Sequence, residues 1–280
     1  MAAQITMSAN NLMLLVAALV AAGAVVGFMS GLLGIGGGGI LVPVLYETFS
    51  ALGVDPAIRM HMALATSLAI IIPTSYRSFS AHRAKGSVDA DLLRRLGPWI
   101  VAGVGLGILT ASFVTSTTLK WFWVVFGSIM AAKLWFGRDS WRLGTEIPKS
   151  RLVEVYAVVV GYISVLISIG GAAFTVALMT LYGRSVLQAV GTSSGFGPMI
   201  AIPGALGFIW AGWDVPGTLP FSLGYVSLLG AALVIPMSVL TAPLGVRLAH
   251  GIPKRRLEQA FALFLCVVVS RFLWLLVTGG

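Results

Sequence analysis

A run of glycines inside an apolar stretch is the first place where this sequence can do chemistry. Four consecutive glycines follow the apolar segment 12–33, namely Gly36, Gly37, Gly38 and Gly39. Glycine loses the most backbone entropy in a helix, so such a run breaks a helix. The freed N–H groups and the positive end of the next helix dipole attract a sulfonate or a carboxylate without a basic side chain. The run therefore predicts an anion-binding turn, with a tight packing turn as the alternative.

A shorter copy of this run, Gly170 and Gly171, lies 134 residues further along the chain. At the same offset, the sequence 161–164 (Gly-Tyr-Ile-Ser) matches the sequence 27–30 (Gly-Phe-Met-Ser). This repetition argues against a chance break in one helix and predicts two related turns. For the second turn, anion binding and packing remain equally open.

Paired hydroxyls also recur at matching places in the two halves. Thr66 and Ser67 correspond to Thr192 and Ser193, and Ser194 follows the second pair. Hydroxyls inside a membrane protein can donate to sulfonate oxygens, but they also bond their own helix carbonyls and join helices. Both roles stay open, and all five residues are predicted substrate-binding residues.

Two ionisable side chains, His61 and Arg77, lie in the same segment as Thr66 and complete the predicted substrate-binding set. A buried guanidinium balances a dianion well, whereas an arginine near a membrane interface extends its tip to the headgroups. Both interpretations stay open for Arg77. The other histidines, His82 and His250, are expected in surface loops.

Two motifs resemble enzyme signatures. The spacing Gly-x-Gly-x-x-Gly at 34–39 matches the dinucleotide fingerprint, but that motif needs a preceding strand and a βαβ unit, and its flanks here are apolar helices. Residues 191–195 contain Gly-x-Ser-x-Gly, the nucleophile elbow, which needs a strand-to-helix turn with His and acid partners. An intramembrane serine hydrolase that uses Ser193 or Ser30 with His61 is the enzyme alternative.

The composition excludes a water-soluble fold. The 280 residues are 58% hydrophobic and 10% charged, whereas soluble domains carry about 25% charged residues. The net charge of +9 is assigned to cytoplasmic loops and lipid headgroups rather than to nucleic acid. The single cysteine, Cys266, leaves no disulfide framework or cysteine metal site. We expect no metal, no cofactor and no catalytic residues.

Apolar segments recur along the chain. Asp55 and Pro56 mark one helix start, with aspartate as N-cap and proline in the first turn. Gly103 and Gly107 form a small-xxx-small face suited to close helix contact. The expected segments are 11–33, 40–51, 55–76, 96–113, 119–136, 152–169, 172–182, a polar-interrupted segment through 191–203, 219–248 and 257–277.

This pattern predicts an all-α integral membrane protein of about eight to ten transmembrane segments. The domains are a first transmembrane repeat over 1–137, a cytoplasmic linker over 138–151 and a second repeat over 152–280. If the short segments 40–51 and 172–182 return the chain to the side it came from, fifteen of the eighteen Lys and Arg residues fall on one face. The positive-inside rule favours that arrangement. It predicts an inverted repeat of two five-segment halves, with both termini outside and with the glycine-led half-helices beginning near the midplane.

The sequence 31–43, Gly-Leu-Leu-Gly-Ile-Gly-Gly-Gly-Gly-Ile-Leu-Val-Pro, resembles the first signature of the TauE/SafE family of membrane anion exporters. The Ala-Thr-Ser at 65–67, the weaker repeat that begins at Gly161 and the Arg-Arg-Leu at 255–257 are also similar to that family. In the second half, 170–173 is Gly-Gly-Ala-Ala where the family commonly has three or more glycines. The resemblance implies transport of sulfite, sulfonates or related small organic anions, usually outward.

We therefore expect a multi-pass secondary transporter of a bacterial inner membrane that exports a small organosulfur anion by alternating access. Its partners would be that anion and the lipid bilayer, with a homodimer left open. No Gly-x-x-x-x-Gly-Lys-[Ser/Thr] motif occurs, so the energy would come from the anion gradient, the membrane potential or a coupled proton. An anion channel is the other non-enzymatic alternative.

Overall fold

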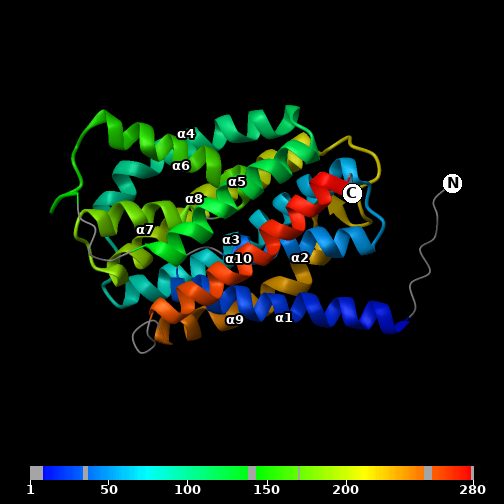
Figure 1. Ribbon diagram of the computed structural model, residues 1–280, viewed down its shortest axis with the longest axis horizontal. Helices are drawn as coiled ribbons and strands as arrows, with labels where there is room; N and C mark the ends of the chain where they lie inside the picture. The colour runs from blue at the N-terminus through cyan, green and yellow to red at the C-terminus, as the bar shows by residue number, and fades with distance from the viewer. Residues whose placement is uncertain (1–8, 34–36, 138–142, 170, 249–253, 279–280) are drawn as a thin grey trace.

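The computed structural model describes residues 9–33, 37–137, 143–169, 171–248 and 254–278. Helices dominate this part of the chain, which confirms the predicted all-α class (Figure 1). A short antiparallel pair, β1 (Ser222–Leu223) and β2 (Val226–Ser227), precedes α9. The helices are α1 (Ala9–Leu33), α2 (Gly38–Ala51), α3 (Pro56–Ala84), α4 (Ala90–Phe113), α5 (Ser116–Phe136), α6 (Arg151–Ile167), α7 (Ala172–Leu181), α8 (Val186–Ala211), α9 (Leu228–Leu248) and α10 (Lys254–Thr278).

Within the described residues, five helices are long and apolar enough to cross a membrane: α3, α4, α5, α8 and α9. α2 has 14 residues and α7 has 10. Both are too short, because about 20 residues are needed to cross the hydrocarbon core. Each of these short helices begins at one of the predicted glycine breaks.

Most helix boundaries agree with the prediction, and the exceptions have local causes. The side chain of Asp55 caps α3, as predicted. α4 begins at Ala90 rather than at 96, because the side chain of Asp89 caps its first turn. α9 begins at Leu228 rather than at 219, because the β1–β2 hairpin occupies the preceding residues.

The prediction of a surface loop for His82 is wrong. This histidine is fully buried in the last turn of α3, and its Nε2 lies 3.1 Å from the carbonyl oxygen of Gly31 on α1. α3 reaches this far because no glycine or proline follows Arg77 before Gly86, which has φ +68°. His250 lies outside the described residues.

The helices pair in a pattern that repeats between the two halves of the chain. α1 lies against α9 as α6 lies against α4, and α2 lies against α3 as α7 lies against α8. α3 and α8 pack on each other, and so do α5 and α10. Exchanging each helix for its counterpart in the other half, α1 for α6 and so on to α5 for α10, gives the same pairs. α2 and α7 lie toward opposite ends of the molecule (Figure 1).

Glycines bring the paired helices into backbone contact. A Cβ on Gly27 of α1 would overlap the carbonyl oxygen of Ser238 on α9. A Cβ on Gly103 of α4 would overlap the carbonyl oxygen of Val158 on α6, and Gly107 faces α6 one turn further on. The predicted small-xxx-small contact is confirmed. Such close approach gives the paired helices extensive van der Waals contact, which drives the association of helices in a bilayer.

Gly103→Ala is expected to lower the free energy of unfolding by about 1–3 kcal/mol, the usual cost of overpacking. The new methyl group would overlap the carbonyl oxygen of Val158. Gly105→Ala on the same helix is the matched control, because nothing lies within 4 Å of a Cβ there and alanine raises helix propensity. Thermal unfolding of the purified protein in detergent measures both. Equal midpoints for the two variants would contradict the packing role of Gly103.

Candidate functional site

Both predicted helix breaks are present, and each has a glycine in the left-handed conformation. Gly37 at φ +75° precedes α2, and Gly171 at φ +66° precedes α7. Residues with a side chain rarely adopt these angles, which accounts for glycine at both positions. Among the described residues no side chain caps either helix, so N–H groups in the first turn of α2 and of α7 are open to other partners. Gly36 and Gly170 lie outside the described residues.

The two turns lie close together in the protein interior. A Cβ on Gly38, the first residue of α2, would overlap the carbonyl oxygen of Ser168, which ends α6 at φ +51°. Gly171 is only three residues beyond Ser168, a reach of at most about 10 Å. Gly38 and Gly39 are buried. The positive ends of the α2 and α7 dipoles are therefore neighbours.

Three buried hydroxyls of α3 and the end of α6 have no hydrogen-bond partner among the described residues: those of Ser67, Ser164 and Ser168. The Ser164 Oγ lies 3.4 Å from the place of a Cβ on Gly171. A buried hydroxyl without a partner costs about 1–3 kcal/mol, so such groups point to a ligand or to ordered water. Ser164 and Ser168 were not among the predicted site residues, although both precede the repeated glycines closely in the sequence.

Leu68, the residue after Ser67, shows which helices lie beside this part of α3. The side chain of Leu68 borders Gly204 of α8 together with the side chain of Val165, three residues before Ser168. α3, α6 and α8 thus converge at the level of the second turn. The predicted residue Ser67 and the second turn come from distant parts of the sequence, and the helix packing brings their elements together.

The two predicted threonines make matching hydrogen bonds. The Thr66 Oγ1 accepts from the backbone N–H of Ser227 at 2.9 Å, just before α9. The Thr192 Oγ1 accepts from the backbone N–H of Asp89 at 2.9 Å, just before α4. Each threonine therefore holds the segment that leads into a helix of the other half.

The predicted serines of α8 donate within their own helix. The Ser193 Oγ donates to Val190 O at 2.9 Å, and the Ser194 Oγ donates to Gly191 O at 2.6 Å. Bonds of this kind are the structural alternative that the sequence left open. In this conformation the two hydroxyl protons are used inside α8.

His61 and Arg77 lie far apart on α3. Their separation of 16 residues corresponds to about 24 Å along the helix. The buried His61 ring has its Nε2 3.1 Å from Val114 O and stacks on Tyr225, with 5.1 Å between ring centroids. Burial raises the pKa of the Tyr225 hydroxyl, so the tyrosine side chain stays neutral. The side chain of Arg77 is exposed. The structure does not bring these two predicted residues together.

The residues of the alternative serine hydrolase site, Ser30 or Ser193 with His61, are also far apart. Ser78 donates to Ser30 O at 3.4 Å, and Ser78 lies about 25 Å along α3 from His61. Ser193 follows Thr192, which bonds to Asp89 beyond the far end of α3. Neither serine is within reach of the histidine, so no nucleophile and base are paired here.

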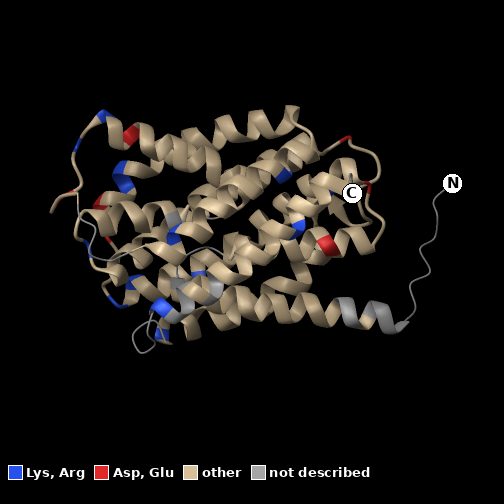
Figure 2. Ribbon diagram, in the orientation of Figure 1, with Lys and Arg blue, Asp and Glu red and all other residues tan. Residues whose placement is uncertain are grey.

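Two cations that were not among the predicted site residues lie near the ring of Tyr46, at the N-terminal end of α3. Lys120 is buried, with its Nζ 5.7 Å from the Tyr46 ring centroid, and the guanidinium of Arg59 lies 5.4 Å from the same centroid. Arg271 of α10 forms an ion pair with Glu47 of α2 at 2.8 Å. Most other Lys and Arg residues gather at the opposite end of the molecule (Figure 2).

One protein family matches nearly the whole chain. The model of the family described as sulfite exporter TauE/SafE matches residues 19–272. The chain belongs to the TauE/SafE family. The resemblance drawn from the glycine signature is thereby confirmed, and the protein is a membrane transporter of this family. No solved structure matches the chain.

Relatives of this TauE/SafE member are named as transporters. A probable membrane transporter protein of Haemophilus influenzae is 31% identical over 255 residues, which cover 90% of this chain and 96% of that protein. A probable membrane transporter protein of Methanocaldococcus jannaschii is 25% identical over 88% of this chain and 91% of its own length. Neither name gives a substrate.

Thr192→Val is expected to lower the free energy of unfolding by about 1–3 kcal/mol, because the N–H of Asp89 loses its acceptor at the start of α4. Thr192→Ser keeps an oxygen at the same place and is the matched control. Thermal unfolding in detergent measures both variants. If the valine variant has the same melting temperature as the serine variant, Thr192 does not anchor the start of α4.

Proposed function

We propose that this TauE/SafE member is a secondary transporter that exports a small organosulfur anion, such as sulfite or the sulfonate sulfoacetate, across the bacterial inner membrane by alternating access. One observation carries the proposal: two helix starts lie close together, and neither they nor the buried hydroxyls of Ser164 and Ser168 beside them have a side-chain partner among the described residues. An anion there would accept from the N–H groups of α2 and α7 and from the hydroxyls. Discontinuous helices of transporters bind substrates in this way.

The proposed contacts fall into two groups. The first surrounds the turns and comprises Gly37, Gly38, Gly39, Gly171, Ser67, Ser164 and Ser168. The second would contact the anion only after exchanging a present partner or while the anion arrives or leaves, and comprises Thr66, Thr192, Ser193, Ser194, His61 and Arg77. Gly36 and Gly170 complete the turns in the sequence.

The repeated helix pairing supports an inverted repeat of two halves that meet at α3 and α8. The gathering of Lys and Arg at one end supports a cytoplasmic assignment of that end by the positive-inside rule. Movement of one half against the other would expose the turns to each side alternately. A negative-inside membrane potential favours the exit of an anion by about 2.3 kcal/mol per charge per 100 mV.

A thermal-shift screen of the purified protein tests the substrate class. Sulfite, sulfoacetate and taurine are compared with sulfate and plain carboxylates. A true ligand at 100 times its Kd stabilises the folded state by about 2.7 kcal/mol. Stabilisation by an organosulfur anion, followed by its transport in proteoliposomes, is expected. The proposal fails if an unrelated solute stabilises the protein and no organosulfur anion does.

Ser67→Ala and Ser164→Ala are each expected to weaken anion binding about tenfold, the equivalent of one hydrogen bond to a charged group. The unliganded variants should melt at the same temperature as the parent or higher, because neither hydroxyl has a partner within the described residues and alanine favours helix. Isothermal titration with the stabilising anion and thermal unfolding without it measure the two effects.

Ser238→Ala is the contrasting control for these variants. Its hydroxyl is also buried in a helix, but it bonds to Thr74 Oγ1 at 2.7 Å and to Ile235 O at 2.9 Å. This variant should lose thermal stability and keep the affinity for the anion. Unchanged affinity in the Ser67 and Ser164 variants would remove these hydroxyls from the binding site.

A further inference from the structure

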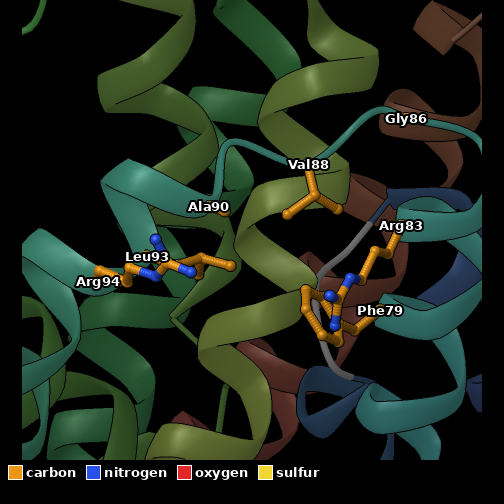
Figure 3. Close-up of a pocket in the computed structure, with 7 residues that line it drawn as sticks. All are labelled: Phe79, Arg83, Gly86, Val88, Ala90, Leu93 and Arg94. Atoms are coloured by element: carbon orange, nitrogen blue, oxygen red, sulfur yellow. The ribbon is translucent and has the colours of Figure 1, made fainter.

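A pocket of about 260 Å³ lies between the end of α3 and the start of α4, at the end of the molecule where Lys and Arg gather. Arg83 of α3 and Arg94 of α4 lie on opposite sides of it (Figure 3). Phe79, Val88 and Leu93 supply apolar surface between the two arginines. The pocket therefore combines two cations with an apolar lining.

The apolar residues connect this pocket to α8. A Cβ on Gly195 of α8 would lie 2.8 Å from Leu93 Cδ1 and 3.0 Å from Phe79 Cδ2. Gly195 directly follows the hydroxyl residues 192–194. Phe79 and Leu93 thus line the pocket on one side and touch α8 beside its hydroxyls on the other. Because residue 195 is a glycine, no Cβ from α8 restricts the ends of the Phe79 and Leu93 side chains.

The arginines are available to a ligand. Arg94 approaches Asp91 at 3.9 Å, but the two side chains are 83% and 97% exposed, so solvent screens this ion pair. Arg83 is also exposed. Guanidinium groups bind sulfonate, carboxylate and phosphate oxygens through paired N–H groups. The adjacent apolar lining fits a short hydrocarbon part, which a bare inorganic anion lacks.

We propose that this pocket receives an organic anion with a short apolar part at the cytoplasmic face, and that Phe79 and Leu93 form the gate between it and α8. The proposal rests on the transport function proposed above and names its cytoplasmic site. The two arginines hold the anionic group while the apolar part lies on Phe79, Val88 and Leu93. Outward rotation of the two gate side chains then opens the path along α8.

Cysteine labelling tests the pocket without requiring transport. Cys266 is the single cysteine of the chain, so Cys266→Ser provides a background for Phe79→Cys or Leu93→Cys. The purified protein is treated with an anionic methanethiosulfonate, the sulfonatoethyl reagent, and with its cationic trimethylammonium counterpart. The anionic reagent is expected to react about tenfold faster at either position, since clustered charge raises the local concentration of counter-ions.

The combined change Arg83→Gln and Arg94→Gln should reduce that preference about fivefold. Arg151→Gln is the matched control, because Arg151 is an exposed arginine outside the pocket lining. Ethanesulfonate and propanesulfonate should protect the cysteine from labelling, and sulfate should protect it less. The proposal is overturned if the cysteines do not react, if the preference survives loss of both arginines, or if sulfate protects as well as propanesulfonate.

A lipid phosphate could offer the arginines the same chemistry, so the labelling is repeated in neutral and in anionic liposomes. Protection by anionic lipid without protection by the alkyl sulfonates would assign the pocket to headgroups and overturn the proposal. In proteoliposomes, the double glutamine variant should raise the KM for cytoplasmic anion about fivefold at unchanged kcat. An unchanged KM would refute the pocket as the cytoplasmic binding site, whereas sulfonate protection without any transport would refute the proposed function alone.

Discussion

The structure depends on how two helices that are too short to cross a membrane are enclosed. α2 and α7 begin at buried glycines, where their first N–H groups must be kept away from the lipid hydrocarbon. Other helices must therefore surround those ends on all sides. α3 and α8 pack at the centre, and α1 with α9 and α4 with α6 close on either side through glycine contacts. The proposed site is a direct result of this enclosure.

Features governed by local backbone chemistry could be predicted from the sequence. Glycine runs marked both breaks, Asp55 marked the start of α3, and Gly103 marked a close helix contact. In each case one residue type fixes a conformation or leaves room for a neighbouring backbone. Such a requirement is visible in the sequence without knowledge of the fold.

Features that depend on what lies opposite a residue could not be predicted. His82 looks polar and loop-bound in the sequence, yet α1 supplies a carbonyl oxygen to it. Thr66 and Ser67 are adjacent and chemically alike, but the first has a backbone partner from the β2 segment and the second has none in the described part of the chain. Lys120 is buried against an aromatic ring from another helix. Only the packing of distant elements separates these cases.

The two glycine turns also differ in how much freedom the sequence has at each. At Gly37 and Gly171 the positive φ demands glycine in both halves. At the next residue the halves diverge, since Gly38 must leave clearance for Ser168 O whereas alanine stands at 172. The first turn therefore requires glycine at two successive positions, 37 for its conformation and 38 for clearance, whereas the second turn requires it at 171. Two turns can therefore share a backbone conformation while they differ in glycine content.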